Sequence, residues 1–299
     1  MFLLNTTNSN RTIIFLTFLF LAGSVMAQES QESSLSDEMG DSLSSLSIIP
    51  LKPLKKKKIL RQAIRRFRHD MQHEHDTRMF QMTMTVSRDS LEPFRVKCSI
   101  FAKSGIALNE DDVASCSKTF DYEGPYKLTP QDSAVIKGYI KHFAIISPVY
   151  VPRIFSIHSP RSSSFGYRIG EVLYPLKKYN QTCFYYETKA YHILDESDRK
   201  IYRMHFVRNG QKRYFRFGGK NYEAGEITGT AYIDGRTMYI SQFNGTARLP
   251  NDKDEVYIVY KITYDEIDNK TFLKHIIAEW RFCGTKINVV LKGSDTNKS

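Results

Sequence analysis

Histidine and acidic side chains gather in one short segment, residues 68–76, and these are the residue types of a metal site. His69 and His73 are four residues apart, so they would share one face of a helix, and His75 follows closely. Imidazole nitrogens are common zinc ligands. The segment is strongly polar and ends a run of basic residues, however, which favours solvated histidines. We therefore predict no metal site.

Motifs of nucleophilic, phosphate or nucleotide chemistry do not occur in the sequence. There is no G-x-S-x-G or H-E-x-x-H motif, no Walker loop and no dinucleotide glycine fingerprint. The glycine pair at residues 218–219 precedes no helix pattern, so we interpret it as a turn. We predict no catalytic residues and no cofactor. A cell-envelope hydrolase, whose catalytic groups are distant in sequence, is the alternative hypothesis.

Strand patterns dominate the elements that would position any site. Residues 80–86 and 94–100 alternate apolar and polar side chains, as in strands with one buried face. Eight more strands are predicted at residues 187–195, 199–208, 212–217, 226–234, 236–244, 254–265, 270–281 and 284–291. Their connections are too short for parallel crossovers. We predict an α+β fold with one large curved antiparallel sheet, a half-barrel-like meander, and a few packing helices.

Two helices are predicted, at residues 54–71 and, after the N-cap Thr129, at residues 130–145. The apolar side of the first is formed by Leu60, Ile64 and Phe67, while nine basic residues between 52 and 68 take its other faces. One interpretation is a helix that packs on the sheet with its charges in solvent. The other is adhesion to an anionic membrane surface or a polyanion. We favour the first and predict only weak membrane-surface contact.

The ratio of helices to strands predicts an apolar concavity. Two helices, each about 10 Å wide, cover less than half of a ten-stranded sheet that spans about 45 Å. The sheet must therefore curl, be covered by the loop near Ser159, or leave its apolar face open. A half-barrel would hold an elongated apolar ligand, such as a lipid, with tyrosine hydroxyls at its rim. The predicted lining residues are Tyr232, Tyr239, Tyr260 and Tyr264.

Three short stretches resemble a bacterial family: residues 59–64 (ILRQAI), 227–234 (ITGTAYID) and 237–240 (TMYI). They are similar to exported carboxypeptidase-like regulatory domain-containing proteins, over about residues 48–290. The β-sandwich that gives the family its name is missing here, so the resemblance implies no peptidase. Physically the second stretch is a hairpin, in which Gly229 permits close approach and Asp234 with Gly235 closes the turn. The sheet pattern also resembles the half-barrel of periplasmic lipoprotein-carrier proteins.

The compartment follows from residues 13–25, an apolar run that predicts a secretory signal peptide over residues 1–27, cut after Ala27. An uncleaved anchor is the alternative, although a membrane span needs about 20 residues. Ser24 stands where a lipoprotein signal carries cysteine. We expect an exported protein without a lipid anchor, periplasmic or outer-membrane-associated if the source is bacterial.

The rest of the chain divides into an acidic, serine-rich leader at residues 28–50, predicted to be disordered, and a single α+β domain at residues 51–295. The composition, with 41% hydrophobic and 25% charged residues, excludes disorder throughout. Much of the net charge of +11 lies in residues 52–68. Basic and aromatic residues also interleave at 212–217, a pattern that occurs on polyanion-binding strands but that we interpret as a cationic strand edge. We predict no nucleic-acid partner, and an envelope protein as a partner besides the ligand.

Four cysteines follow the predicted cleavage site, at positions 98, 116, 183 and 283. In an oxidising compartment they allow one or two disulfides, with three connectivities for two bonds. Cys98 falls on the apolar face of a predicted strand, where a thiol packs as a small hydrophobe. The sequence leaves these alternatives open.

Overall fold

The computed structural model describes residues 46–49, 51–72, 78–88, 91–102, 120–144, 172–193, 200–217, 219–249, 256–282 and 284–293. The predicted signal peptide, most of the predicted leader and the loop near Ser159 lie outside these residues. So do His73, His75, Cys116 and Cys283. The predictions that concern them therefore stay predictions.

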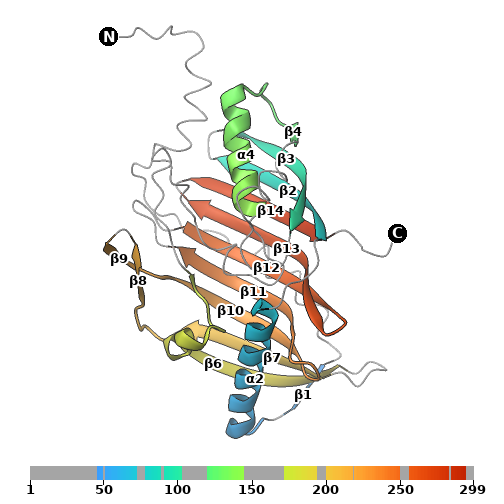
Figure 1. The fold of residues 1–299 in the computed structure, drawn as a ribbon, viewed down its shortest axis with the longest axis vertical. Helices are drawn as coiled ribbons and strands as arrows, with labels where there is room; N and C mark the ends of the chain where they lie inside the picture. Colours follow the sequence, from blue (N-terminus) through green and yellow to red (C-terminus); the bar gives the residue numbers. More distant parts are fainter. Residues whose placement is uncertain are drawn as a thin grey trace.

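Strands make up most of the described chain. They are β1 (Leu46–Ile49), β2 (Arg78–Arg88), β3 (Leu91–Ala102), β4 (Asp121–Glu123), β5 (Val172–Leu173), β6 (Phe184–Ile193), β7 (Lys200–Arg208), β8 (Tyr214–Phe217), β9 (Lys220–Glu223), β10 (Gly225–Asp234), β11 (Ile240–Leu249), β12 (Val256–Ile267), β13 (Lys270–Phe282) and β14 (Thr285–Gly293). Twelve of them form one sheet in the order β1-β6-β7-β10-β11-β12-β13-β14-β2-β3-β4, with β5 paired to β10. The sheet is curved and open (Figure 1). The predicted fold class is confirmed.

The path of the sheet differs from a plain meander in three places. The predicted strand at 212–217 is not part of the large sheet, because β8 pairs with β9 in a separate hairpin and β7 pairs directly with β10. The early hairpin of β2 and β3 joins beyond the last strand, where β14 pairs with β2. In addition, β1 pairs with β6, so the sheet begins within the segment predicted as a leader.

The residues at the turns explain how neighbouring strands are joined. Asp268 and Asn269 have φ angles of 51° and 61°, the positive values that a two-residue hairpin loop of type I′ requires. At the predicted hairpin between β10 and β11, Asp234 Oδ1 accepts hydrogen bonds from the backbone N–H groups of Arg236 and Thr237. Gly229 lies opposite Gly245, and a Cβ on Gly229 would come within 2.0 Å of the Asn244 carbonyl oxygen. The prediction of close strand approach at Gly229 is confirmed.

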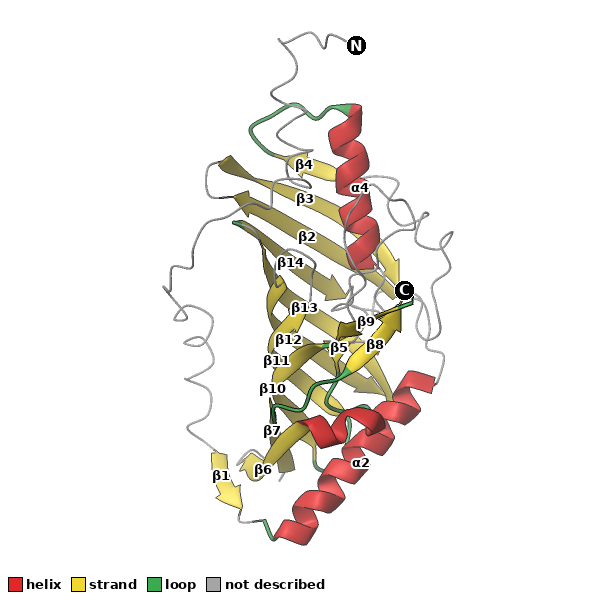
Figure 2. Ribbon diagram, turned by 90° about the vertical axis from the view of Figure 1, so that its left-hand side faces the viewer, coloured by secondary structure: helices red, strands yellow, loops and turns green. Residues whose placement is uncertain are grey.

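Two helices, α2 (Pro53–Gln72) and α4 (Pro130–Ala144), lie on the same side of the sheet (Figure 2). The start of α4 is a capping box: Thr129 Oγ1 accepts from the Asp132 N–H, and an Asp132 carboxylate oxygen accepts from the Thr129 N–H. Ile136 and Ile140 of α4 are fully buried. Among the described residues, no helix is long and apolar enough to cross a membrane.

The apolar side of α2 packs on the sheet as predicted. Ile64 and Phe67 are buried in the core, and Leu60 is partly buried against it. One basic residue departs from the prediction that all its charges lie in solvent. Arg66 donates to the Asn269 carbonyl oxygen at 2.6 Å and pairs with the Glu266 carboxylate at 3.3 Å. The guanidinium therefore ties α2 to the turn between β12 and β13, because it reaches past the edge of the apolar stripe.

The helix–sheet contact predicts a large stability loss for Phe67→Ala. Removing a buried ring of this size costs about 3–5 kcal/mol of unfolding free energy. The control Arg65→Ala removes an exposed side chain of the same helix and should cost less than about 0.5 kcal/mol. Urea unfolding followed by circular dichroism measures both. A loss for Phe67→Ala as small as that of the control would contradict packing of α2 through this ring.

Candidate functional site

The inner face of the sheet, on the side of the two helices, carries the hydrophobic core of the described residues. Along β12 every second side chain points to this face and is buried, while the intervening ones are only half-buried. The buried set is Val256, Ile258, Tyr260, Ile262 and Tyr264. This is the period-two pattern of a strand with one covered face.

An aromatic stack fills the space between α2 and the sheet. Phe67 of α2 stacks on Tyr174, which follows β5, with ring centroids 4.8 Å apart. Tyr174 in turn stacks on Phe243 of β11 at 5.6 Å, and Phe243 lies 5.1 Å from Phe206 and 5.9 Å from Tyr260. At this end of the sheet the interior is therefore occupied by the protein's own rings.

The central part of the inner face lies between the two helices. α2 lies across the β6–β11 end of the sheet and α4 across the β2–β4 end (Figure 1 and Figure 2). Two cross-strand rows run over β12, β13, β14 and β2. The first contains Tyr260, Ala278, Val289 and Met84, and the second contains Ile262, Ile276, Leu291 and Met82. All eight side chains are buried. In the first row the small side chain of Ala278 lies between the larger ones of Tyr260 and Val289.

The four predicted lining tyrosines do not form one group. Tyr260 and Tyr264 lie on the inner face and Tyr239 is buried beside the β10–β11 turn, whereas Tyr232 is half-buried and lies on the opposite face from its neighbours Ala231 and Ile233. The expectation that the hydroxyls reach a rim is wrong for Tyr260, because its O–H donates to the Thr228 carbonyl oxygen at 3.1 Å inside the core. Strand alternation assigns a face to a residue but does not say what lies above it.

Tyr174 is the member of this group that the sequence interpretation missed. It is fully buried and joins Tyr260 and Tyr264 beneath α2. Its segment, residues 172–176, is wholly buried and contains Val, Leu, Tyr, Pro and Leu. This short apolar run could have indicated a buried segment. However, β5 has only two residues, which is too short for an alternating pattern to be recognised.

Burial sets the chemistry of these three phenols. Burial raises the pKa of the Tyr174 hydroxyl well above 10, and the neighbouring Tyr264 and Tyr260 hydroxyls raise it further. Burial likewise raises the pKa of Tyr260 and of Tyr264. Transferring an anion into an apolar interior is costly, so each group stays a neutral hydroxyl. The three side chains therefore carry neutral hydroxyls, which are able to donate hydrogen bonds.

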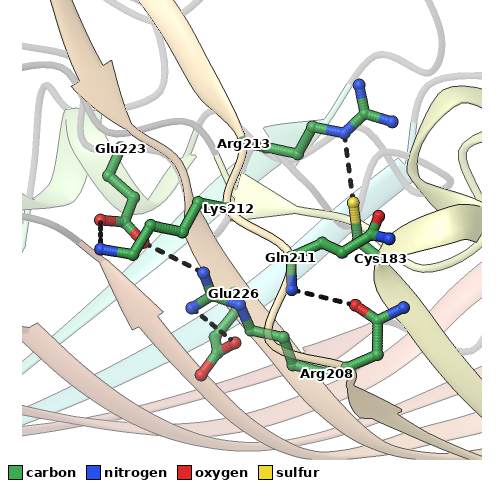
Figure 3. A network of polar contacts seen from close by, with 8 residues as sticks. Cys183, Arg208, Gln211, Lys212, Arg213, Glu223 and Glu226 are labelled. Atoms are coloured by element: carbon green, nitrogen blue, oxygen red, sulfur yellow. Dashed lines mark hydrogen bonds and ion pairs between the residues drawn. The ribbon is translucent and has the colours of Figure 1, made fainter.

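A second cluster of polar side chains anchors the β8–β9 hairpin. Arg208 of β7 pairs with Glu223 of β9 and with Glu226 of β10, each at 3.0 Å, and Lys212 pairs with Glu223 at 3.2 Å (Figure 3). The hydrogen bond from Arg208, with help from Lys212, lowers the pKa of Glu223. An isolated two-stranded hairpin is marginally stable, so these ion pairs hold it to the body.

The basic residues at 212–217 are thus partly used within the structure rather than left for a polyanion. Arg213 donates from Nε to the Cys183 sulfur at 3.2 Å and from Nη2 to the Tyr179 carbonyl oxygen at 2.8 Å (Figure 3 shows the first of these). Tyr179 and Cys183 belong to the short helix η2 (Lys178–Cys183). Cys183 is a buried thiol, and Cys98 is buried on the inner face as predicted.

Within the described part of the chain, no three His, Cys, Asp or Glu side chains form a group that could hold a metal ion. His69 is exposed near the end of α2, and its predicted neighbours His73 and His75 lie outside that part of the chain. The described side chains thus offer a large apolar face and neutral donors.

Comparison with known proteins gives no family assignment. No protein-family model and no curated protein matches the sequence. A solved DUF1329 family protein from Desulfovibrio piger is 12% identical, with a TM-score of 0.29, over 81% of this chain and 94% of the other. A LolA superfamily protein from Nitrosomonas europaea is 11% identical, with a TM-score of 0.24, over 80% of this chain and 91% of the other. At such TM-scores neither likeness carries a function to this chain, and the resemblance to carboxypeptidase-like regulatory proteins stays a prediction.

The raised phenol pKa values predict that stability falls at alkaline pH. In the unfolded chain these tyrosines ionise near pH 10, whereas in the folded protein they keep their protons to higher pH. Their stabilisation is therefore complete below pH 10 and is lost as the pH rises above it. Each phenol contributes a loss of about 1.4 kcal/mol per pH unit.

Urea midpoints between pH 9 and pH 11 measure this loss. Tyr264→Phe should reduce the slope of the unfolding free energy against pH by the contribution of one proton, about 1.4 kcal/mol per pH unit. Tyr185→Phe is the matched control, because Tyr185 is 66% exposed and should leave the slope unchanged. Equal slopes for Tyr264→Phe and the parent protein would show that the Tyr264 hydroxyl ionises freely in the folded state.

Proposed function

We propose that this protein is a non-enzymatic exported module that binds an elongated apolar ligand, such as a lipid, on the inner face of its curved sheet. The observation that carries the proposal is the pair of apolar rows over β12, β13, β14 and β2, which lie between the two helices and contain no charged side chain. Met82 and Met84 lie in these rows, and methionine side chains adapt to ligands of irregular shape. The ligand site is confined to this central stretch, because the aromatic stack fills the end beneath α2.

The outer side of α2 supports a second part of the same function, contact with an anionic membrane surface. Lys57, Lys58, Arg61 and Arg65 are exposed, and none of them pairs with an acidic side chain within the described ranges. Leu54, at the first turn of the helix, is 83% exposed. An exposed leucine beside lysines is the composition of a helix that lies in the headgroup region of a bilayer. A lipid-binding module would collect or deliver its ligand at such a surface.

Localisation in an exported compartment, periplasmic or outer-membrane-associated in a bacterium, belongs to this proposal as well. The predicted signal peptide supports it. An envelope protein would be the second partner, which receives or supplies the ligand.

Ligand binding is tested with the neutral hydrophobic dye Nile red. We expect saturable fluorescence with the folded protein and displacement of the dye by extracted envelope lipid. Ala278→Leu enlarges the smallest residue of the first row, so it should weaken dye binding about threefold or more. Thr83→Leu, on the other face of β2, is the control and should not change it. Without saturable binding the inner face is only a structural core, and an interaction scaffold replaces the carrier.

Membrane contact is tested by sedimentation with vesicles. Each basic side chain near an anionic bilayer contributes about 1 kcal/mol. The double change Arg61→Gln and Arg65→Gln should therefore weaken binding to phosphatidylglycerol vesicles about tenfold or more, and added salt should weaken it further. Arg248→Gln removes an exposed charge from β11 and serves as the control. Equal binding to phosphatidylcholine and phosphatidylglycerol would contradict this role of α2.

A further inference from the structure

Two hydroxyls in the apolar core beneath α2 have no hydrogen-bond partner among the described residues, those of Tyr174 and Tyr264. Tyr174 is fully buried and Tyr264 is only 7% exposed. The third phenol of the group, Tyr260, is different, because its O–H is bonded to the Thr228 carbonyl oxygen. Leaving a buried donor unsatisfied costs free energy, so native proteins rarely do it without a reason.

The two hydroxyls lie where the filled end of the inner face meets its central stretch. The ring of Tyr174 is held in the stack between Phe67 and Phe243. Tyr264 pairs across the strands with Leu273 of β13, next to the rows that contain Met82 and Met84. From β12 to β2 these rows cross three strand spacings, about 14 Å in all. An extended alkyl chain along the rows would thus have its end at the two phenols.

The surroundings of the hydroxyls select the chemical group that they would meet. The ring of Tyr174 contacts the rings of Phe67 and Phe243, and Leu273 lies opposite Tyr264 on the next strand. A carboxylate placed there would lose its hydration, which is unfavourable, and the guanidinium of Arg66 is already paired with Glu266. A carbonyl oxygen is neutral and accepts two hydrogen bonds, so it satisfies both donors at once.

We propose that the Tyr174 and Tyr264 hydroxyls donate hydrogen bonds to the carbonyl oxygen of a neutral lipid ester whose alkyl chain lies along the central inner face. This inference rests on the proposed function and specifies it. The site distinguishes an ester from a fatty acid by charge, and an ester from a hydrocarbon by the two hydrogen bonds.

Competition against bound Nile red tests the assignment, with methyl dodecanoate, dodecane and dodecanoate as probes. The parent protein should bind methyl dodecanoate about tenfold more tightly than dodecane, because it gains two neutral hydrogen bonds. Tyr264→Phe and Tyr174→Phe should each reduce affinity for the ester about fivefold and leave affinity for dodecane unchanged. Tyr185→Phe is the control, since it removes an exposed hydroxyl that lies outside the two rows, and it should preserve the preference for the ester.

Thermal unfolding shows whether the variants fold. If Tyr174→Phe does not fold, the result for Tyr264→Phe alone tests the inference. The inference is overturned if dodecane and the ester compete equally, or if Tyr264→Phe keeps the parent's preference for the ester. In either case the phenols serve the core or hold water, and the proposed binding of an apolar ligand still stands. Tighter binding of dodecanoate than of the ester also overturns it. If no probe displaces the dye, the proposed function fails together with this inference.

Discussion

Burial of the inner face of one wide, open sheet is the constraint on which the other features of this molecule depend. β12 contributes five buried apolar side chains to that face, from Val256 to Tyr264. Two helices cover its ends, and the ring of Phe67 joins α2 to Tyr174 and Phe243 in a continuous stack. Apolar burial of this kind is the main favourable term in folding. The stack therefore both fixes α2 on the sheet and limits any ligand to the strands beyond it.

The position of α2 has consequences on both of its sides. Its apolar side packs on the core, so its basic residues face outward. Arg66 is the exception among the described contacts, because its guanidinium reaches back to the β12–β13 turn. A helix built in this way presents a cationic surface with no conformational change. The proposed lipid exchange at a membrane would use that surface, and the proposed binding on the inner face would keep the ligand away from water.

Local sequence patterns predicted the parts of the fold that depend on local chemistry. Alternation located the strands, Thr129 marked the start of α4, and Asp234 with Gly235 marked the turn between β10 and β11. Partner choice between strands was not readable, because alternation specifies a face and not a neighbour. The segment at 212–217 therefore looked like a strand of the meander, although it pairs with β9 in a hairpin held by Arg208 and Glu223.

The candidate site was predictable only in part for the same reason. Tyr260 and Tyr264 lie on the buried inner face, but Tyr232 lies on the other face, and Tyr174 follows a strand of only two residues. Which hydroxyl finds a partner depends on three-dimensional contacts such as that between Tyr260 and Thr228, which join residues 32 positions apart. No spacing rule along one strand reports a contact of that kind.

Methyl NMR of the protein labelled with ¹³C at its methionine methyl groups tests the central claim, ligand binding on the inner face, most directly. Met82 and Met84 lie in the central rows of β2, whereas Met79 of the same strand is 36% exposed. Titration with methyl dodecanoate should shift the Met82 and Met84 signals in a saturable way and leave the Met79 signal in place. Shifts confined to Met79, or none at all, would contradict the account.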